Sequence, residues 1–171
     1  MKLVIASDIH GSYTWFEKLL GVVEQERPDH LLLLGDLLYH GPRNDLPQGY
    51  APKKVVPALN MLADKIIAVR GNCEAEVDQM VLDFPCMADY ALLHDGERQL
   101  FCTHGHLPAK SPDDLPALPA GSIFISGHTH VKRDDVVGGI RVFNPGSVGL
   151  PKDGSHSCGI YENGDLRFVA L

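Results

Sequence analysis

The sequence predicts an α/β (α+β) fold: a four-layer sandwich in which two mixed β-sheets pack face to face and α-helices flank them. In the first half, fully apolar runs alternate with segments of helical spacing, a pattern typical of parallel strands buried on both faces. In the second half, Asp95-Gly96 and Asn163-Gly164 separate short β-rich runs, as in antiparallel hairpins. The chain has 171 residues, of which 44% are hydrophobic and 22% charged, as in an ordinary globular protein.

The first half begins with a β-rich run at residues 2–7. A helix is expected from Tyr13 to Glu26, because Phe16, Leu19, Leu20 and Val23 recur at helical spacing. A second apolar strand follows at residues 30–34, then a long loop at residues 37–52, a helix at 53–63 and a strand at 65–70. Right-handed crossovers would place the ends of these strands on one edge of a sheet.

The second half contains more strands. Residues 90–94 and 98–103 form one predicted hairpin, residues 159–161 and 166–170 form another, and residues 122–126 and 140–143 are further short strands. The total is about nine or ten strands and three or four helices. The proline-rich stretch 108–119 is expected to be a loop with at most one helical turn. No linker or repeat divides the chain, so residues 1–171 are expected to form a single domain.

Composition excludes several classes of function. With 15 Lys plus Arg against 22 Asp plus Glu, the net charge is −7, and no long nucleic acid partner is expected. No apolar stretch approaches the roughly 20 residues that cross a bilayer, and the N-terminus lacks a signal-peptide cleavage site. The four cysteines are widely spaced without a C-x-x-C pair, which favours free thiols. We therefore expect a cytoplasmic protein without membrane contact.

Metal-ligating residue types follow the apolar runs along the whole chain. They occur in Asp8-Ile9-His10-Gly11, Gly35-Asp36, Gly71-Asn72, Thr103-His104-Gly105 and Gly127-His128-Thr129-His130. Ligand sites of open α/β sheets lie at the carboxyl ends of strands, so the topology itself should gather these side chains. Carboxylates, imidazoles and an amide oxygen at one edge predict a metal site with room for substrate. The expected metal ligands are Asp8, His10, Asp36, Asn72, His104, His128 and His130.

This ligand set predicts a two-metal hydrolase. Two cations about 3.5 to 4 Å apart can activate water and neutralise a phosphoryl group. Asp36 is the candidate bridging carboxylate, Asp8 and His10 suit one metal, and Asn72 and His104 suit the other. His128 and His130 can serve different metals. The mixture of donors favours Mn, Fe or Zn over Ca or Mg.

The loop 37–52 starts directly after Asp36, and loops at the rim of a site often determine substrate choice. Arg43 could clamp a phosphate through its planar set of donors. The alternative is an ordinary solvated arginine.

Taken together, Asp8-x-His10, Gly35-Asp36, Gly71-Asn72, His104-Gly105-His106 and Gly127-His128-Thr129-His130 resemble the ordered motifs of the calcineurin-like metallophosphoesterase superfamily. Four further stretches resemble the small bacterial YfcE-type phosphodiesterases: Ser7-Asp8-Ile9-His10-Gly11, His40-Gly41-Pro42-Arg43-Asn44, Arg70-Gly71-Asn72-Cys73 and Asn144-Pro145-Gly146-Ser147. The resemblance covers the whole chain.

The resemblance implies a metal-dependent phosphodiesterase in which a water or hydroxide bridging two metals attacks phosphorus in line. One metal would be held by Asp8, His10, Asp36 and His130, and the other by Asp36, Asn72, His104 and His128. Asp36, Asn72 and His104 would act in catalysis with the bridging water. The cofactor would be two divalent ions, manganese first, with zinc, nickel or iron as alternatives. The substrate would be a small phosphodiester, and a homo-oligomer is a further implication.

One residue departs from the wider superfamily. Many members follow the asparagine ligand with a histidine that contacts substrate, whereas this chain has Cys73, as the YfcE-like branch does. A neutral thiol is a poorer proton donor than an imidazolium, so activated leaving groups should react faster. We expect Arg43, Asn44, Cys73 and His106 to contact substrate; for Cys73 the alternative is simple packing.

Two rival functions follow from the same motifs. A binding scaffold of this fold that has lost catalysis, like a subunit of the retromer coat, would lack ligands, but all seven are present here. A phosphomonoesterase or nuclease of the same superfamily is the alternative within enzymes. The acidic net charge weakens the nuclease interpretation.

Overall fold

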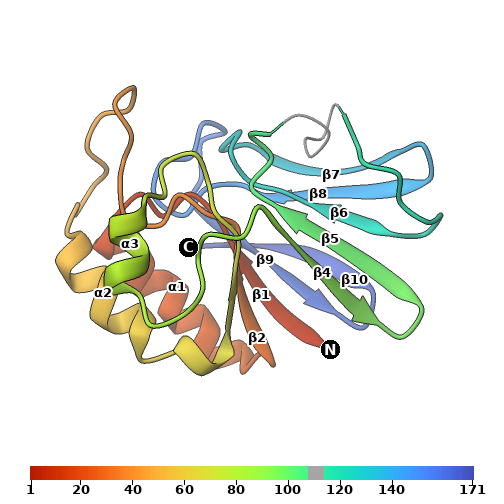
Figure 1. Cartoon of the computed structure of the whole chain (residues 1–171), viewed down its shortest axis with the longest axis horizontal. Coiled ribbons are helices and arrows are strands. Elements are labelled where there is room, and N and C mark those ends of the chain that lie inside the picture. Colours follow the sequence, from red (N-terminus) through yellow and green to blue (C-terminus); the bar gives the residue numbers. More distant parts are fainter. Residues whose placement is uncertain (108–113) are drawn as a thin grey trace.

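Two mixed five-stranded β-sheets form the centre of the molecule (Figure 1). The structure is a computed structural model, and it describes residues 1–107 and 114–171. The first sheet has the order β10-β9-β1-β2-β3. Its strands are β1 (Lys2–Ala6), β2 (His30–Leu33), β3 (Ile66–Ala68), β9 (Ser157–Glu162) and β10 (Asp165–Ala170). The parallel strands β1, β2 and β3 lie side by side, and β9 pairs antiparallel with β1.

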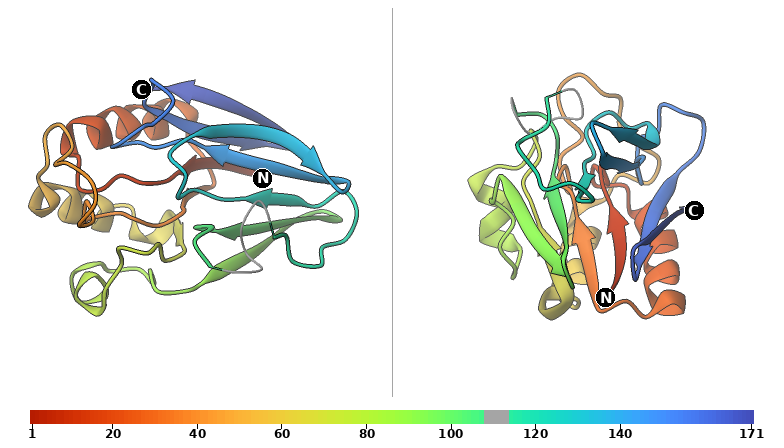
Figure 2. Two further views of the ribbon diagram at one scale, coloured as in Figure 1. Left: turned by 90° about the horizontal axis from the view of Figure 1, so that it is seen from above. Right: turned by 90° about the vertical axis from the view of Figure 1, so that its right-hand side faces the viewer.

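The second sheet has the order β4-β5-β6-β8-β7. Its strands are β4 (Tyr90–Asp95), β5 (Arg98–Thr103), β6 (Ile123–Ile125), β7 (Lys132–Val137) and β8 (Ile140–Pro145). The parallel strands β5, β6 and β8 form the middle of this sheet, and β4 and β7 flank them as antiparallel edges. Figure 2 shows the two sheets from two further sides.

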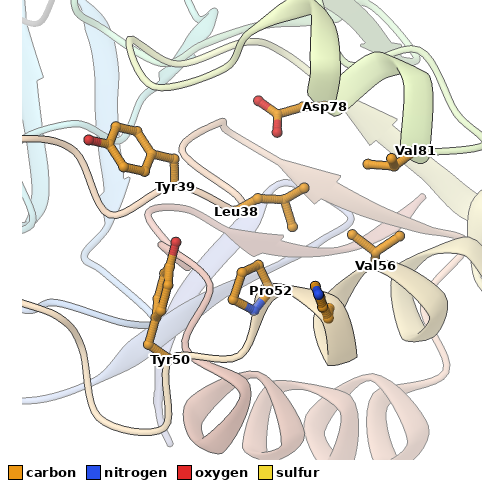
Figure 3. Close-up of a pocket in the computed structure, with 8 residues that line it drawn as sticks. Leu38, Tyr39, Tyr50, Pro52, Val56, Asp78 and Val81 are labelled. Atoms are coloured by element: carbon orange, nitrogen blue, oxygen red, sulfur yellow. The ribbon is translucent and has the colours of Figure 1, made fainter.

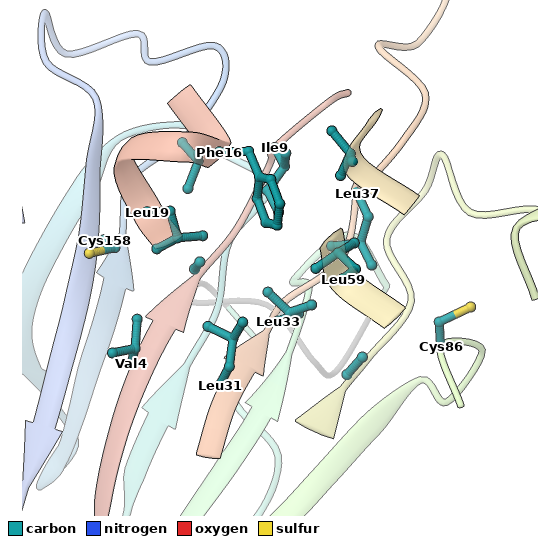
Figure 4. Close-up of a cluster of buried hydrophobic side chains, with 14 of the residues drawn as sticks. Val4, Ile9, Phe16, Leu19, Leu31, Leu33, Leu37, Leu59, Cys86 and Cys158 are labelled. Carbon is teal, nitrogen blue, oxygen red and sulfur yellow. The ribbon is translucent and has the colours of Figure 1, made fainter. Parts of the chain in front are cut away.

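Helices cover the outer face of the first sheet. They are α1 (Tyr13–Glu26) and α2 (Pro52–Asn60), followed by a 3₁₀ turn at Ala63–Lys65, while the shorter α3 (Glu76–Val81) follows β3. Alternate residues of β1 explain why this strand is apolar throughout: Val4 packs toward the helices, whereas Leu3 and Ile5 belong to the core shared with the second sheet. Figure 4 shows the cluster under the helices, including Phe16 and Leu19 of α1.

The core between the sheets draws on both. Leu32 and Leu34 of the first sheet region share this cluster with Cys102, Ile125 and Phe143 of the second. A smaller cluster on the second sheet contains Phe101, Phe124, Ile140 and Val142, with Leu115 and Leu118 packed against it. Among the described residues, this outer cluster is therefore covered by an irregular segment and not by a helix.

The predicted pair of mixed sheets with helices outside is confirmed, and the differences concern the ends of elements and two elements that were not predicted. The helix expected at residues 53–63 ends at Asn60, and the strand expected at 65–70 spans only Ile66–Ala68. Both predicted hairpins form. No described helix is long and apolar enough to span a membrane. Of the proline-rich loop 108–119, residues 108–113 lie outside the described part, and residues 114–119 contain no helix.

The structure adds two elements that the sequence patterns did not predict, α3 and β7. Helix α3 has only six residues, too few for a helical period to stand out. Strand β7 reads Lys-Arg-Asp-Asp-Val-Val and has no buried residue, as is common for charged edge strands.

Candidate metal centre

The expected ligands lie where strands end. Asp8 follows β1, Asp36 follows β2, Asn72 follows β3, and His104 follows β5. His128 and His130 follow β6. The carboxyl ends of strands from both sheets therefore supply this one site.

The backbone at five of these ligands is left-handed. The φ angles are 55° at Asp8, 49° at His10, 54° at Asp36, 67° at His128 and 60° at His130. A left-handed conformation costs a residue other than glycine about 1 kcal/mol or more, and such residues cluster at functional sites. Only two other non-glycine residues of the described part, Arg27 and Asn163, have a positive φ. Most of this strain is thus concentrated at the expected ligands.

Asp8, His10 and His130 form the first ligand cluster. His130 Nε2 lies 3.2 Å from Asp8 Oδ1, and His10 Nε2 lies 3.6 Å from the same oxygen. The two Nε2 atoms are 3.2 Å apart. One ligand atom from each of the three residues lies within 4.8 Å of the others, which is close enough to share one metal ion.

Asp8, Asp36 and His104 form the second cluster. His104 Nε2 lies 3.5 Å from Asp36 Oδ2 and 3.2 Å from Asn72 Oδ1. Asp36 Oδ2 is also 3.7 Å from His10 Nε2 in the first cluster. Asp36 therefore faces both clusters, the position that a bridging carboxylate needs.

His128 lies beside these clusters. Its backbone N–H donates to Asp8 Oδ2 over 3.0 Å, and its ring centroid is 5.0 Å from that of His104. Its side chain lines the pocket described below. Burial and the charge of His104 lower its pKa, which keeps the imidazole neutral and able to ligate a metal.

Hydrogen bonds fix the ring orientation of three histidines. Nδ1 of His10 donates to the carbonyl of Tyr39 (2.8 Å), Nδ1 of His104 to Leu34 (2.6 Å) and Nδ1 of His130 to Leu150 (2.5 Å). Because a carbonyl only accepts, Nδ1 carries a proton in each of these rings, and Nε2 faces the centre. Metal-ligating histidines are commonly held this way.

The charges and unpaired atoms at the centre fit a bound cation. Asp8 Oδ1 is buried and has no hydrogen-bond donor among the described residues, whereas Asp8 Oδ2 accepts from Ser7 Oγ and His128 N. Burial opposes ionisation of Asp8, but contacts with His10 and His130 hold the pKa of its carboxyl well below the usual range. Burial also disfavours a charge on His104, yet Asp36 and Asp8 raise its pKa to about 9. An orphaned carboxylate oxygen among inward-facing imidazole nitrogens fits a divalent metal.

Cys73 lies next to the centre. Its Sγ is within 4.8 Å of ligand atoms of His10 and Asp36, and its N–H donates to Asp36 Oδ1 over 2.9 Å. Burial and the nearby Asp36 raise the pKa of the thiol, so it stays neutral. His10, Asp36 and Cys73 are close enough to one another to hold a metal ion, so Cys73 belongs to the immediate surroundings of the centre.

Glu74 is a supporting residue that the sequence patterns missed. Its carboxylate accepts hydrogen bonds from the backbone N–H groups of Asp36 (2.8 Å), Leu37 (2.7 Å) and Gly71. It thereby joins the segments that follow β2 and β3 and fixes the backbone of Asp36. Burial raises the pKa of Glu74. Its position directly after Asn72-Cys73 is the sequence signal that could have pointed to it.

Asn144 supports the segment that carries His128 and His130. Its Nδ2 donates to the carbonyl of Gly127 over 2.7 Å and to Thr129 Oγ1 over 3.1 Å. Ser147 Oγ donates to the carbonyl of Asp8 over 2.8 Å. The Asn144-Pro145-Gly146-Ser147 turn thus ties the second sheet to both ligand-bearing loops.

A pocket of about 500 Å³ opens beside the ligands. Its lining combines expected ligands with polar and cationic side chains, namely Asp36, Arg43, Asn44, Asn72, His128, Thr129, His130 and Lys152. Arg43 and Asn44 lie where the sequence predicted substrate contacts, whereas Lys152 was not predicted. An adjoining pocket is lined by Arg43, Asn44 and Cys73.

His106 also lies near the centre. Its ring centroid is 5.3 Å from that of His104 and 6.2 Å from that of His128. Its buried Nδ1 has no hydrogen-bond partner among the described residues. Burial and the charge of His104 lower its pKa to about 4.

Tyr39 connects the centre to an apolar pocket of about 430 Å³ (Figure 3). Its carbonyl holds His10, whereas its ring lines the apolar pocket together with Leu38, Tyr50, Pro52 and Val56. A change of the Tyr39 side chain would therefore alter the pocket without removing the carbonyl that orients His10.

The chain matches the sequence model of the calcineurin-like phosphoesterase superfamily domain over residues 1–165. It is 49% identical over 172 residues to phosphodiesterase YfcE of Escherichia coli K12, covering 100% of this chain and 92% of that protein. The solved structure of the E. coli phosphoesterase YfcE superposes with a TM-score of 0.92 at 46% identity, covering 100% of both chains. An archaeal phosphodiesterase has a TM-score of 0.74 at 23% identity, again over 100% of both chains, which shows a shared fold.

Proposed function

This chain belongs to the calcineurin-like phosphoesterase superfamily, and from that premise we propose that it hydrolyses phosphodiester bonds at a dinuclear metal centre. The observation that carries the proposal is the convergence on Asp8 Oδ1. This buried oxygen has no hydrogen-bond donor among the described residues, and the Nε2 atoms of His10, His104 and His130 lie 3.2–4.0 Å from it. The likeness to phosphodiesterase YfcE gives the reaction class.

We propose two overlapping ligand sets. Asp8, His10, Asp36 and His130 would hold one metal, while Asp36, Asn72, His104 and His128 would hold the other. The short distances from Asp36 Oδ2 to His10 Nε2 (3.7 Å) and to His104 Nε2 (3.5 Å) support its bridging role. The mixture of imidazole, carboxylate and amide donors supports Mn²⁺, with Zn, Ni or Fe as alternatives.

When bound, the two cations would supply a water-derived nucleophile at neutral pH and would neutralise charge on the phosphoryl group. The chain's own residues give the site its geometry. Carbonyls of Tyr39, Leu34 and Leu150 hold the three imidazoles in the ligating tautomer. Glu74 fixes the backbone of Asp36 through its hydrogen bonds to backbone N–H groups. Such preorganisation means that little reorganisation is needed during the reaction.

Arg43 and Asn44 would contact the substrate, because both line the pocket beside Asp36 and Asn72. His106 would contact the substrate or orient His104. Cys73 would shape the pocket next to Asn72, and its neutral thiol would give little help to a poor leaving group.

A phosphomonoesterase or nuclease is the second candidate. The match to the phosphoesterase superfamily does not by itself distinguish a diesterase from a monoesterase or a nuclease. The 49% identity to a phosphodiesterase and the net charge of −7 favour a small diester over a monoester or a long nucleic acid. A catalytically weak scaffold is disfavoured because all seven expected ligands are present.

Three wider features complete the proposal. Residues 1–171 would act as a single domain, since the core between the sheets includes Leu3 and Leu166 from near both ends. Four free cysteines support a reducing, cytoplasmic location.

Exposed apolar side chains on α3, Val77 and Met80, support a homo-oligomer, which light scattering would test.

The test of the function is hydrolysis of matched esters. Protein stripped of metal and reloaded with Mn²⁺ should hydrolyse bis(p-nitrophenyl) phosphate much faster than p-nitrophenyl phosphate. A preference for the monoester would overturn the diesterase assignment and leave a monoesterase of the same superfamily.

A further inference from the structure

Two cationic side chains line the metal pocket from different parts of the chain. Arg43 comes from the loop between β2 and α2, and Lys152 comes from the loop between β8 and β9. Both side chains are exposed. The pocket therefore has cations in addition to the expected metals.

Neither cation has an ion-pair partner among the described residues. Within residues 1–107 and 114–171, the structure records no hydrogen bond or ion pair of the Arg43 guanidinium or the Lys152 ammonium group. Lys132, by contrast, pairs with Asp153 over 2.8 Å, and Arg141 pairs with Asp134 over 2.8 Å. An unpaired cation that lines a pocket remains available for an anionic ligand.

The backbone of Lys152 is nevertheless firmly placed. Its N–H donates to the carbonyl of His130 over 2.9 Å, and Leu150 accepts from His130 Nδ1. The neighbouring Asp153 accepts from both the backbone N–H (2.7 Å) and the ammonium (2.8 Å) of Lys132. The lysine is thus fixed to the segment of a metal ligand while its side chain is free to reach into the pocket.

A charge count indicates what the cations would bind. Two divalent metals and the carboxylates of Asp8 and Asp36 leave a net charge of about +2. A phosphodiester anion and a hydroxide nucleophile would cancel that charge. Arg43 and Lys152 add two further positive charges, which a simple diester does not neutralise.

We propose that Lys152 is a specificity-determining residue that, together with Arg43, binds a second phosphate group on the substrate. The substrate class would then be small phosphodiesters whose organic part carries an additional phosphate monoester. The inference deepens the proposed function and rests on it for the position of the scissile diester.

The test uses two aryl diesters that differ only in the extra phosphate. They are the p-nitrophenyl ester of thymidine 5′-monophosphate and the same ester with a 3′-phosphate. In Mn²⁺-loaded protein, Lys152→Gln should lower kcat/KM about tenfold for the phosphorylated ester and less than about twofold for the other. Lys152→Arg should keep most of the preference for the phosphorylated ester over the unphosphorylated one. Lys18→Gln, at an exposed position on α1, is the matched control and should change neither rate.

Binding of product-like ligands gives a second readout that does not depend on turnover. Thymidine 3′,5′-bisphosphate should bind the loaded wild type about tenfold more tightly than thymidine 5′-monophosphate, and Lys152→Gln should remove that difference. Equal effects of Lys152→Gln on both ligands and both esters, or no effect on any, would overturn the inference. If neither ester is hydrolysed by the wild type, the proposed function fails, while the binding comparison still decides the role of Lys152.

Discussion

His130 Nε2 lies 3.2 Å from Asp8 Oδ1, and the other nitrogen of the same ring is turned to a backbone carbonyl. This second nitrogen, Nδ1, donates to the carbonyl of Leu150. Asp8 Oδ1 has no hydrogen-bond donor among the described residues. Two lone-pair donors held this close in a buried site are stabilised when a cation lies between them. This pair is the strongest structural argument for a metal at the junction of the two sheets.

Asp36→Asn should remove metal and turnover together. The amide keeps an oxygen for the N–H of Cys73 but loses the negative charge that faces His10 and His104. We expect kcat for an aryl diester to fall by at least about 100-fold. Even residues that only hydrogen-bond to metal ligands typically contribute about 10–100-fold to metal affinity or activity. Metal content by mass spectrometry and the rate should fall in parallel. Asp135→Asn, at an exposed position on β7, is the control, and full metal content with normal activity in Asp36→Asn would refute the bridging role.

Glu74→Gln should weaken metal binding without removing a ligand. A glutamine amide cannot accept all of the backbone hydrogen bonds from Asp36, Leu37 and Gly71, since one carboxylate oxygen becomes a donor. The apparent Kd for Mn²⁺ should rise about 10- to 100-fold, and the free energy of unfolding should fall by about 1–3 kcal/mol. Titration with Mn²⁺ and chemical denaturation measure the two effects. Glu97→Gln, at an exposed position in the β4–β5 turn, should leave both values unchanged; equal Mn²⁺ affinity in both variants would remove Glu74 from the supporting role.

Reaction rates should depend strongly on the leaving group. The thiol of Cys73 lies beside His10 and Asp36, and burial raises its pKa, so it is a poor proton donor to an alkoxide. Aryl phosphodiesters should therefore react much faster than alkyl phosphodiesters in the Mn²⁺-loaded protein. Cys73→His should reduce the difference between the rates for aryl and alkyl phosphodiesters. Similar rates for aryl and alkyl esters in the wild type would mean that another side chain acts as the general acid.

Leu32→Ala should destabilise the whole molecule. Leu32 is fully buried in the core between the two sheets, where its removal leaves a cavity. The free energy of unfolding should fall by about 2–5 kcal/mol in urea denaturation. Leu46→Ala removes a leucine that is 63% exposed, and it should change stability by no more than about 0.5 kcal/mol. A small loss for Leu32→Ala would mean that the two sheets contribute little to each other's stability.

The fold was largely predictable because burial on both faces makes the inner strands apolar throughout. The runs of β1 and β2 stand out for this reason, and Asp95-Gly96 and Asn163-Gly164 identify the hairpins. Strand β7 could not be found in the same way, because it is a charged edge strand whose pairing with β8 depends on tertiary structure.

The site was predictable where ligand chemistry coincides with strand ends. Asp8, Asp36 and His104 are gathered by topology alone. Glu74 and Lys152 were not predicted, since a glutamate that accepts backbone hydrogen bonds and a lysine that lines a pocket have no distinctive spacing in the sequence. The left-handed backbone at the ligands was equally hidden, because the glycines beside them, at positions 11, 35, 71, 105 and 127, predict tight turns but not the conformation of the ligands themselves.

The most direct test of the account is the metal stoichiometry of the purified protein, measured by mass spectrometry after removal of metal and reconstitution with Mn²⁺, together with the rate on bis(p-nitrophenyl) phosphate. We expect two Mn²⁺ ions per chain and a rate of diester hydrolysis that rises with metal content. Protein that binds no Mn²⁺, Zn²⁺, Ni²⁺ or Fe²⁺ and hydrolyses no diester would contradict it.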